Sequence, residues 1–248
     1  MTTPDAKTMT LYRPVGLREM ELILKADPRL PLVEITKAGQ PIDTIPETKH
    51  TVAKSHAGGF PPRLPEQPIF YPVLNFEYAE QIARDWNTKN PESDYCGFVT
   101  EFEVGKAYAG KFEVHTVGAS IHKELWVPAE ELEEFNNHIK GYINLKAAYY
   151  GERYKGIKNW HMEWYADEMF DGFYQLASGY GQDFLGEMST NRIAVFLNFK
   201  YWIEHDCSDI VPRGDEKERL LRLIADTWLR MFPNMPLFGH DLIRNSSR

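Results

Sequence analysis

The sequence predicts a mixed α+β protein in two parts: an α+β domain over residues 1–156 and a mainly helical extension over residues 157–248. Two observations predict this arrangement. Apolar and polar residues alternate at 97–104 and 111–117, which is typical of half-buried antiparallel strands. In the second part, apolar residues recur instead at the three-to-four-residue spacing of helices.

The composition is that of a globular protein. The 248 residues are 43% hydrophobic and 13% aromatic, enough for a core. No apolar run is long enough for a transmembrane helix, and the first residues lack the apolar core of a secretion signal. The two cysteines, Cys96 and Cys207, exclude a disulfide scaffold, so we expect a reduced, cytoplasmic protein. The net charge of −8 argues against a nucleic-acid partner.

The first secondary-structure elements are predicted from the local pattern of apolar residues and prolines. A strand is expected at 9–13 and a helix at 16–25. Residues 27–68 hold eight of the 16 prolines and predict a long irregular loop, which in a compact domain is usually functional or mobile. A short strand at 69–73 follows, and Pro72 places it at an edge or a strand end.

The remaining sequence of the first domain predicts a helix, then a strand that runs directly into a second helix, and finally one more strand. Asn75 is a suitable N-cap for a helix over 75–86. A strand at 122–127 runs into a helix that begins at Pro128, a residue suited to the first helical position. A last strand fits at 141–148.

The second part predicts three helices. Apolar residues share one face over 160–177. The run 193–203 is apolar almost throughout and predicts a buried element, a helix rather than a strand. The clearest helix covers 216–232 and ends at Pro233.

His122 and Glu124 are two residues apart on a predicted strand, so their side chains share a face. A carboxylate beside a polar partner can stabilise a developing cation or orient a hydroxyl. The alternative is an ordinary exposed strand with polar residues outward. His115 lies on another alternating strand that can come near Glu124.

Arg13, after Tyr12 near the end of the first strand, can hold a carboxylate or phosphate with two hydrogen bonds. The alternative is a surface arginine. The proline-rich run 60–68 is either a rigid functional loop or a polyproline-like connector.

The order of these pieces resembles ADP-ribosyltransferase-like domains. The resemblance is carried by three strings, Leu-Tyr-Arg-Pro-Val-Gly-Leu at 11–17, Ile-Phe-Tyr-Pro at 69–72 before an alanine-containing helix, and His-Lys-Glu-Leu-Trp-Val-Pro at 122–128. Residues 11–150 are also similar to a set of uncharacterised bacterial proteins, most distinctively over 60–75 and 124–132.

The resemblance implies a mixed-sheet domain that uses NAD as a substrate. By that resemblance Arg13 and Tyr12 would contact NAD and Tyr71 would pack against the nicotinamide. Glu124 would stabilise the ribosyl cation, and His122 would help to place a protein or small-molecule acceptor.

The implied activity is ADP-ribosyl transfer or NAD hydrolysis. The sequence departs from the family pattern at three places. No Ser-Thr-Ser string follows the first strand, His122 stands where many arginine-modifying members carry Gln or Glu, and Pro14 and Val15 replace small polar residues. A non-catalytic protein-binding module on the same scaffold is therefore the alternative.

Residues 159–187 contain six acidic residues, eight aromatic residues and no lysine or arginine. On a helix, Glu163, Asp167 and Asp171 would form one stripe. This stripe is a solvated helix face, a surface for a basic protein partner, or a divalent-metal site with His161. We favour the solvated face, and the remaining histidines show no metal-ligand spacing.

Overall fold

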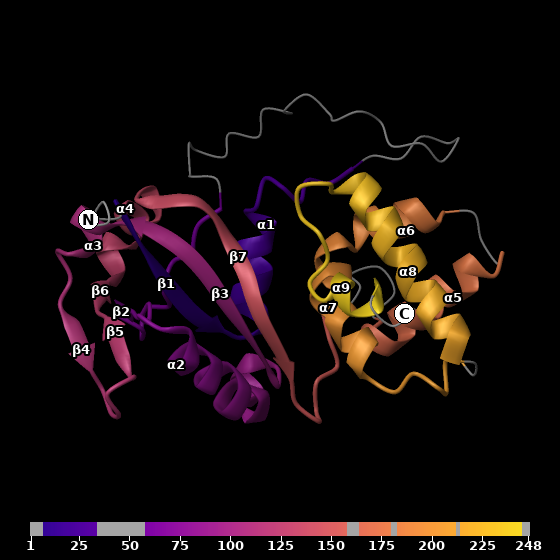
Figure 1. Ribbon diagram of the computed structural model, residues 1–248, viewed down its shortest axis with the longest axis horizontal. Helices are drawn as coiled ribbons and strands as arrows, with labels where there is room; N and C mark the ends of the chain where they lie inside the picture. The colour runs from indigo at the N-terminus through magenta and orange to yellow at the C-terminus, as the bar shows by residue number, and fades with distance from the viewer. Residues whose placement is uncertain (1–6, 34–57, 158–163, 180–182, 212–213, 245–248) are drawn as a thin grey trace, which may run out of the picture. The chain divides into compact units, whose positions relative to one another are not determined.

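The computed structural model divides into two compact units, Met1–Pro28 with Ala53–Tyr154 and Arg29–Val52 with Lys155–Arg248, called here the first and second units. The structure describes residues 7–33, 58–157, 164–179, 183–211 and 214–244. Mixed α+β structure with an antiparallel sheet characterises the first unit, and the second is mainly helical (Figure 1).

Three antiparallel strands form the centre of the first unit. They are β1 (Thr8–Val15), β3 (Cys96–Gly105) and β7 (Ile139–Tyr150), with β3 in the middle. The strands predicted at 9–13, 97–104 and 141–148 are confirmed. Because β3 is central, both of its faces are largely buried, which its alternating sequence alone does not indicate.

The sheet continues beyond β1 through short pieces. Val73 forms a bridge with Tyr12 of β1 on one side and with Glu124 on the other. β5 (Lys123–Leu125) pairs with β4 (Val114–Thr116) at this edge, whereas β2 (Ile69–Phe70) and β6 (Val127–Pro128) form a separate two-stranded sheet. The strands expected at 69–73 and 122–127 are thus present as shorter segments, and the second is interrupted at Trp126. The first ends before Pro72, which lacks an amide donor.

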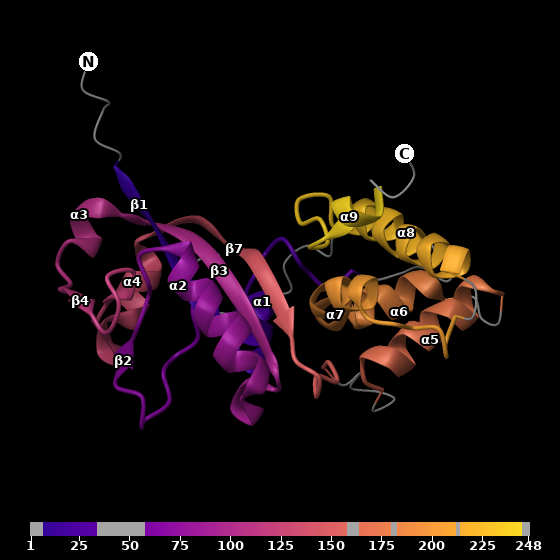
Figure 2. The ribbon, with the colours of Figure 1, turned by 60° about the horizontal axis from the view of Figure 1, so that its bottom comes forward.

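The two faces of the sheet carry different helices (Figures 1 and 2). On one face, Arg13 contacts Glu19 of α1 (Leu17–Lys25). On the other, Tyr12 packs against Phe76 at the start of α2 (Phe76–Gln81). Neighbouring residues of one strand point to opposite faces, so α1 and α2 lie on opposite sides of β1.

The helix predicted over 75–86 has two parts. Asn75 is its N-cap, because its side chain accepts a hydrogen bond from the Tyr78 amide (3.0 Å). α2 then passes into the π-helical turn η1 (Ile82–Trp86). This turn packs Ala83 directly against β3.

The short elements that remain in the first unit join these parts. They are the 3₁₀ turns η2 (Asn87–Lys89), η3 (Pro91–Ser93) and η4 (Ala129–Glu131), and the helices α3 (Lys106–Ala109) and α4 (Leu132–Asn137). The helix predicted after Pro128 therefore begins as a 3₁₀ turn. Residues 58–68 of the proline-rich loop form neither helix nor strand, and 34–57 lie outside the described residues.

Gly97 permits the close approach of η1 to β3. A Cβ atom at Gly97 would overlap the backbone carbonyl of Ala83. We expect Gly97→Ala to destabilise the first unit by about 1–3 kcal/mol, because the backbone must shift to admit the methyl group. Gly105→Ala in the same strand is the matched control, since its Cβ would meet no atom within 4 Å. Urea unfolding measures both, and equal stability of the two variants would contradict this account.

The second unit packs its helices around α7 (Arg192–Glu204). The others are α5 (Ala166–Ala177), α6 (Phe184–Thr190), α8 (Gly214–Met231) and α9 (His240–Arg244). α7 is buried on nearly all sides, which confirms the prediction of a buried helix at 193–203. The helix expected over 160–177 begins at Ala166; residues 158–163 lie outside the described residues. None of the described helices has the length and apolar composition needed to cross a bilayer.

Residues 29–33 belong to the second unit although they precede most of the first in sequence. Arg192 of α7 donates from Nε to the Leu30 carbonyl (3.0 Å), and the Ser189 hydroxyl accepts from the Val33 amide (3.0 Å). The predicted division at residue 156 lies close to the start of the second stretch, Lys155. It does not include residues 29–33, which belong to the second unit.

Candidate functional site

Glu124 is held at the centre of a row of side chains that crosses the sheet. Direct pairing joins Tyr12 to Val73, Val73 to Glu124, and Glu124 to His115 of β4. Residues paired in this way share a face of the sheet, so all four point to the side that carries α2. Glu124 is only 9% exposed. The expected proximity of His115 to Glu124 is thus confirmed.

The Glu124 carboxylate is surrounded by aromatic side chains. Trp126 donates from its indole nitrogen to Glu124 Oε1 (2.8 Å), a charge-assisted hydrogen bond that orients the carboxylate. The Trp126 ring stacks on His115, with ring centroids 4.0 Å apart, and meets Tyr71 edge to face at 5.9 Å. Burial and the Glu124 charge raise the pKa of Tyr78.

His122 lies beside this group with both ring nitrogens engaged. The Ala119 amide donates to Nδ1 (3.2 Å), which requires that Nδ1 carry no proton. Nε2 then carries the proton and donates to Gln81 Oε1 (2.9 Å). The imidazole also stacks on Tyr78, with centroids 4.4 Å apart. These contacts hold the imidazole against Tyr78 and α2, so His122 can position both.

Arg13 projects from the opposite face. Its guanidinium donates twice to Glu19, from Nε (2.7 Å) and Nη2 (3.1 Å), and once to the Tyr71 carbonyl from Nη1 (3.3 Å). It also lies 4.6 Å from the centroid of the Phe70 ring. The roles that the resemblance implies require Arg13, Tyr71 and Glu124 to line one cleft. Only Tyr71 and Glu124 lie on the same face, joined through Trp126.

Tyr12 and Tyr71 differ in exposure. Tyr12 is half-buried against Phe76, and burial together with the Glu101 carboxylate raises its pKa. Tyr71 is 36% exposed, as is suitable for a ring that receives a ligand. Trp126, at 41% exposure, is the aromatic residue that the sequence reasoning passed over. The sequence does contain a signal for it: Trp126 follows Glu124 by two residues on an extended segment, which places both side chains on the same face.

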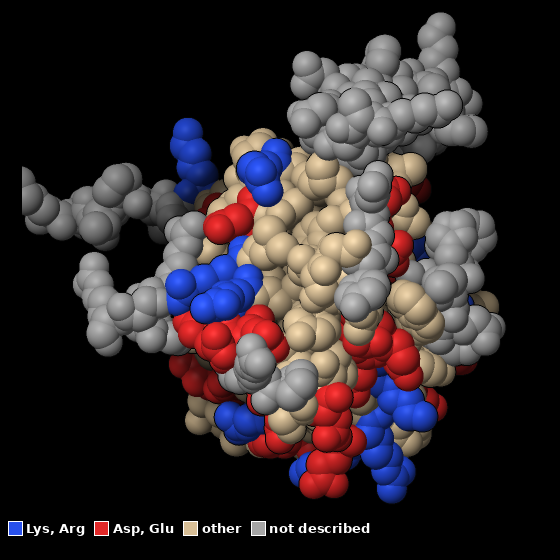
Figure 3. Space-filling model, turned by 90° about the vertical axis from the view of Figure 1, so that its right-hand side faces the viewer, with Lys and Arg blue, Asp and Glu red and all other residues tan. Residues whose placement is uncertain are grey.

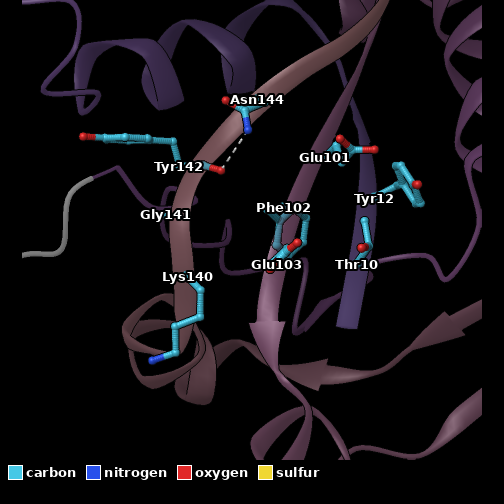
Figure 4. A pocket seen from close by; sticks show the side chains of 9 residues that line it. All are labelled: Thr10, Tyr12, Glu101, Phe102, Glu103, Lys140, Gly141, Tyr142 and Asn144. Atoms are coloured by element: carbon cyan, nitrogen blue, oxygen red, sulfur yellow. Dashed lines mark hydrogen bonds between the residues drawn. The ribbon is translucent and has the colours of Figure 1, made fainter. Parts of the chain in front are cut away.

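A polar hollow opens on the same face where β3 and β7 separate (Figure 4). Glu101 pairs with Asn144 and Glu103 with Lys140, so a bulge in β7 faces Phe102. The hollow has a volume of about 450 Å³. Tyr12 lines it and also belongs to the row that contains Glu124. Three strand spacings separate Glu101 from Glu124, which amounts to roughly 14 Å.

The acidic segment of the second unit is largely engaged in helix capping and local pairs. Asp183 accepts from the Gly186 amide (2.9 Å), and Glu168 from the Tyr165 amide (3.1 Å). In Figure 3 acidic side chains on this side lie beside basic ones. His161 and Glu163 lie outside the described residues. Among the residues described, no three His, Cys, Asp or Glu side chains converge as metal ligands would.

Comparisons with models of protein families, with curated proteins and with solved structures found no match to this chain.

Proposed function

We propose that the first unit binds NAD as a substrate and transfers its ADP-ribosyl group to an acceptor or to water. The observation that carries this proposal is the nearly buried Glu124 carboxylate, oriented by Trp126, whose ring meets the exposed ring of Tyr71. A fixed negative charge in an apolar surrounding acts strongly on positive charge that develops nearby.

The proposed chemistry is cleavage of the bond between the ribose and the nicotinamide. As this bond breaks, the ribose carbon gains positive charge, and the Glu124 carboxylate stabilises it. Tyr71 stacks on the nicotinamide. His122 acts as a positioning residue, because both of its nitrogens bind within the protein. Nicotinamide leaves with the bonding electron pair, and a protein or small-molecule acceptor, or water, attacks the same ribose carbon and gives up its proton to solvent.

The alternative is a non-catalytic binding module with a transferase-like scaffold. It is favoured by Arg13, which the resemblance assigns to NAD but which here is bound to Glu19 on the opposite face. In that alternative, the aromatic surface of Tyr71 and Trp126 binds a protein partner and no NAD is consumed. A basic partner for the acidic aromatic segment remains a separate prediction.

Thermal unfolding with and without NAD is the first test. A ligand that binds only the native state stabilises it by about 2.7 kcal/mol at a hundredfold excess over Kd. We therefore expect NAD to raise the Tm of the wild-type chain. Trp126→Ala should reduce this rise because it removes one wall of the site, whereas the exposed Trp86→Ala, outside it, should not. No rise with NAD, together with no NAD consumption, would support the binding-module alternative.

A further inference from the structure

Two arginines share a single carboxylate on the face of the sheet opposite Glu124. Arg13 donates to both oxygens of Glu19, as described above. Arg63, from the proline-rich loop, brings Nη1 to 3.6 Å from Glu19 Oε2. Its Nη2 donates to the neutral side-chain carbonyl of Gln67. The three ionisable side chains therefore carry one net positive charge.

This positive charge is poorly exposed to water. The side chains of Arg13, Arg63 and Glu19 are 9%, 11% and 21% exposed. Charged groups removed from water are normally paired and hydrogen-bonded, because an uncompensated charge is costly there. Arg63 Nε is buried, and no hydrogen-bond partner for it exists among the described residues. Burial and the neighbouring Arg13 lower the pKa of Arg63, as expected where positive charge is in excess.

The surroundings hold the two guanidinium groups in place. Arg13 lies over the Phe70 ring and donates to the Tyr71 carbonyl, so it cannot turn away from Glu19 without losing both contacts. Arg63 follows Pro61 and Pro62, which restrict the backbone of the loop. The whole chain has a net charge of −8, so this local positive charge contrasts with the rest of the molecule.

We propose that the cluster of Arg13, Glu19 and Arg63 binds an oxyanion, the carboxylate or phosphate group of a small ligand. Arg63 Nε is the donor without a partner in this cluster, and an oxyanion can accept from it and offset the excess positive charge. An oxyanion beside Arg63 brings the net charge of the cluster to zero or makes it negative, while Glu19 keeps Arg13 in position. The inference is independent of the proposed NAD chemistry, because its test uses anions alone.

The test is thermal unfolding of the full chain in increasing inorganic phosphate or acetate, at constant ionic strength set with sodium chloride. We expect a saturable rise in Tm with at least one of the two anions. The stronger anion identifies the ligand group. Arg63→Gln, which removes the charge, should abolish the rise. Arg84→Gln is the control, since Arg84 is half-exposed and paired with Asp85 at the surface.

Arg63→Lys keeps the charge but loses the Nε donor and the planar guanidinium group, so it should weaken binding at least several-fold without abolishing it. Arg63→Lys also tests oxyanion binding if Arg63→Gln does not fold. The proposal is overturned by a wild-type Tm that neither anion raises, or by a rise that is equal in wild type and Arg63→Lys.

Discussion

Replacement of Glu124 by glutamine should lower the rate of NAD consumption by about 10²–10³, the typical effect of removing a group that stabilises transition-state charge. Glutamine keeps the size of the side chain and the oxygen that accepts from Trp126. It removes the negative charge, which matters most when the ribosyl cation forms. NAD binding should therefore change little, and the loss should appear in kcat.

The measurement is NAD consumption by purified wild type and Glu124→Gln, with melting curves to show that both are folded. Glu133→Gln is the control, since Glu133 is exposed on α4 and outside the row that holds Glu124. Equal kcat values for wild type and Glu124→Gln would remove Glu124 from the mechanism. NAD binding without consumption by wild type would point to a scaffold that has lost its activity.

The largest expected effect on stability is that of Trp202→Ala in the second unit. Trp202 is fully buried in α7, stacks on Phe170 of α5 at 5.3 Å between centroids, and donates to the Ala166 carbonyl (2.8 Å). Removing a large buried aromatic side chain typically costs about 3–5 kcal/mol. Because α7 is the helix around which the others pack, we expect the whole second unit to unfold more readily.

Trp202→Phe separates packing from hydrogen bonding, since it keeps an aromatic ring and leaves the Ala166 carbonyl without its donor. It should cost less than Trp202→Ala. The control is Trp86→Ala at the surface, with 51% exposure and an expected change within about 0.5 kcal/mol. Urea unfolding measures all three, and comparable losses for Trp86→Ala and Trp202→Ala would contradict the assigned core.

Local pattern predicted the principal elements because strands and helices have characteristic repeats of apolar residues. The alternation at 97–104 predicted β3, and the run at 193–203, apolar almost throughout, predicted a buried helix. Asn75 marked the start of α2, since a side-chain oxygen there can accept from an unpaired amide. Prolines indicated irregular backbone, as residues 58–68 show.

Local sequence patterns could not predict the shortest elements or the contacts between segments far apart in sequence. The helices α6 and α9 span only seven and five residues, too few to establish a periodic pattern. The π-helical turn η1 depends on its packing against β3 at Gly97. Residues 29–33 join the second unit through hydrogen bonds to Ser189 and Arg192, more than 150 positions away in sequence.

By itself, the sequence determined that Glu124 and His122 share a face, because alternation along a strand is a property of the backbone. Only the tertiary structure decided which other residues share that face. The bridges through Val73 set the register that brings Tyr12 to the side of Glu124 and turns Arg13 away. A register shift of one residue would bring Arg13 to the side of Glu124 and turn Tyr12 away, since neighbouring side chains on a strand point in opposite directions. Such a register depends on pairing between distant segments, and no local pattern contains it.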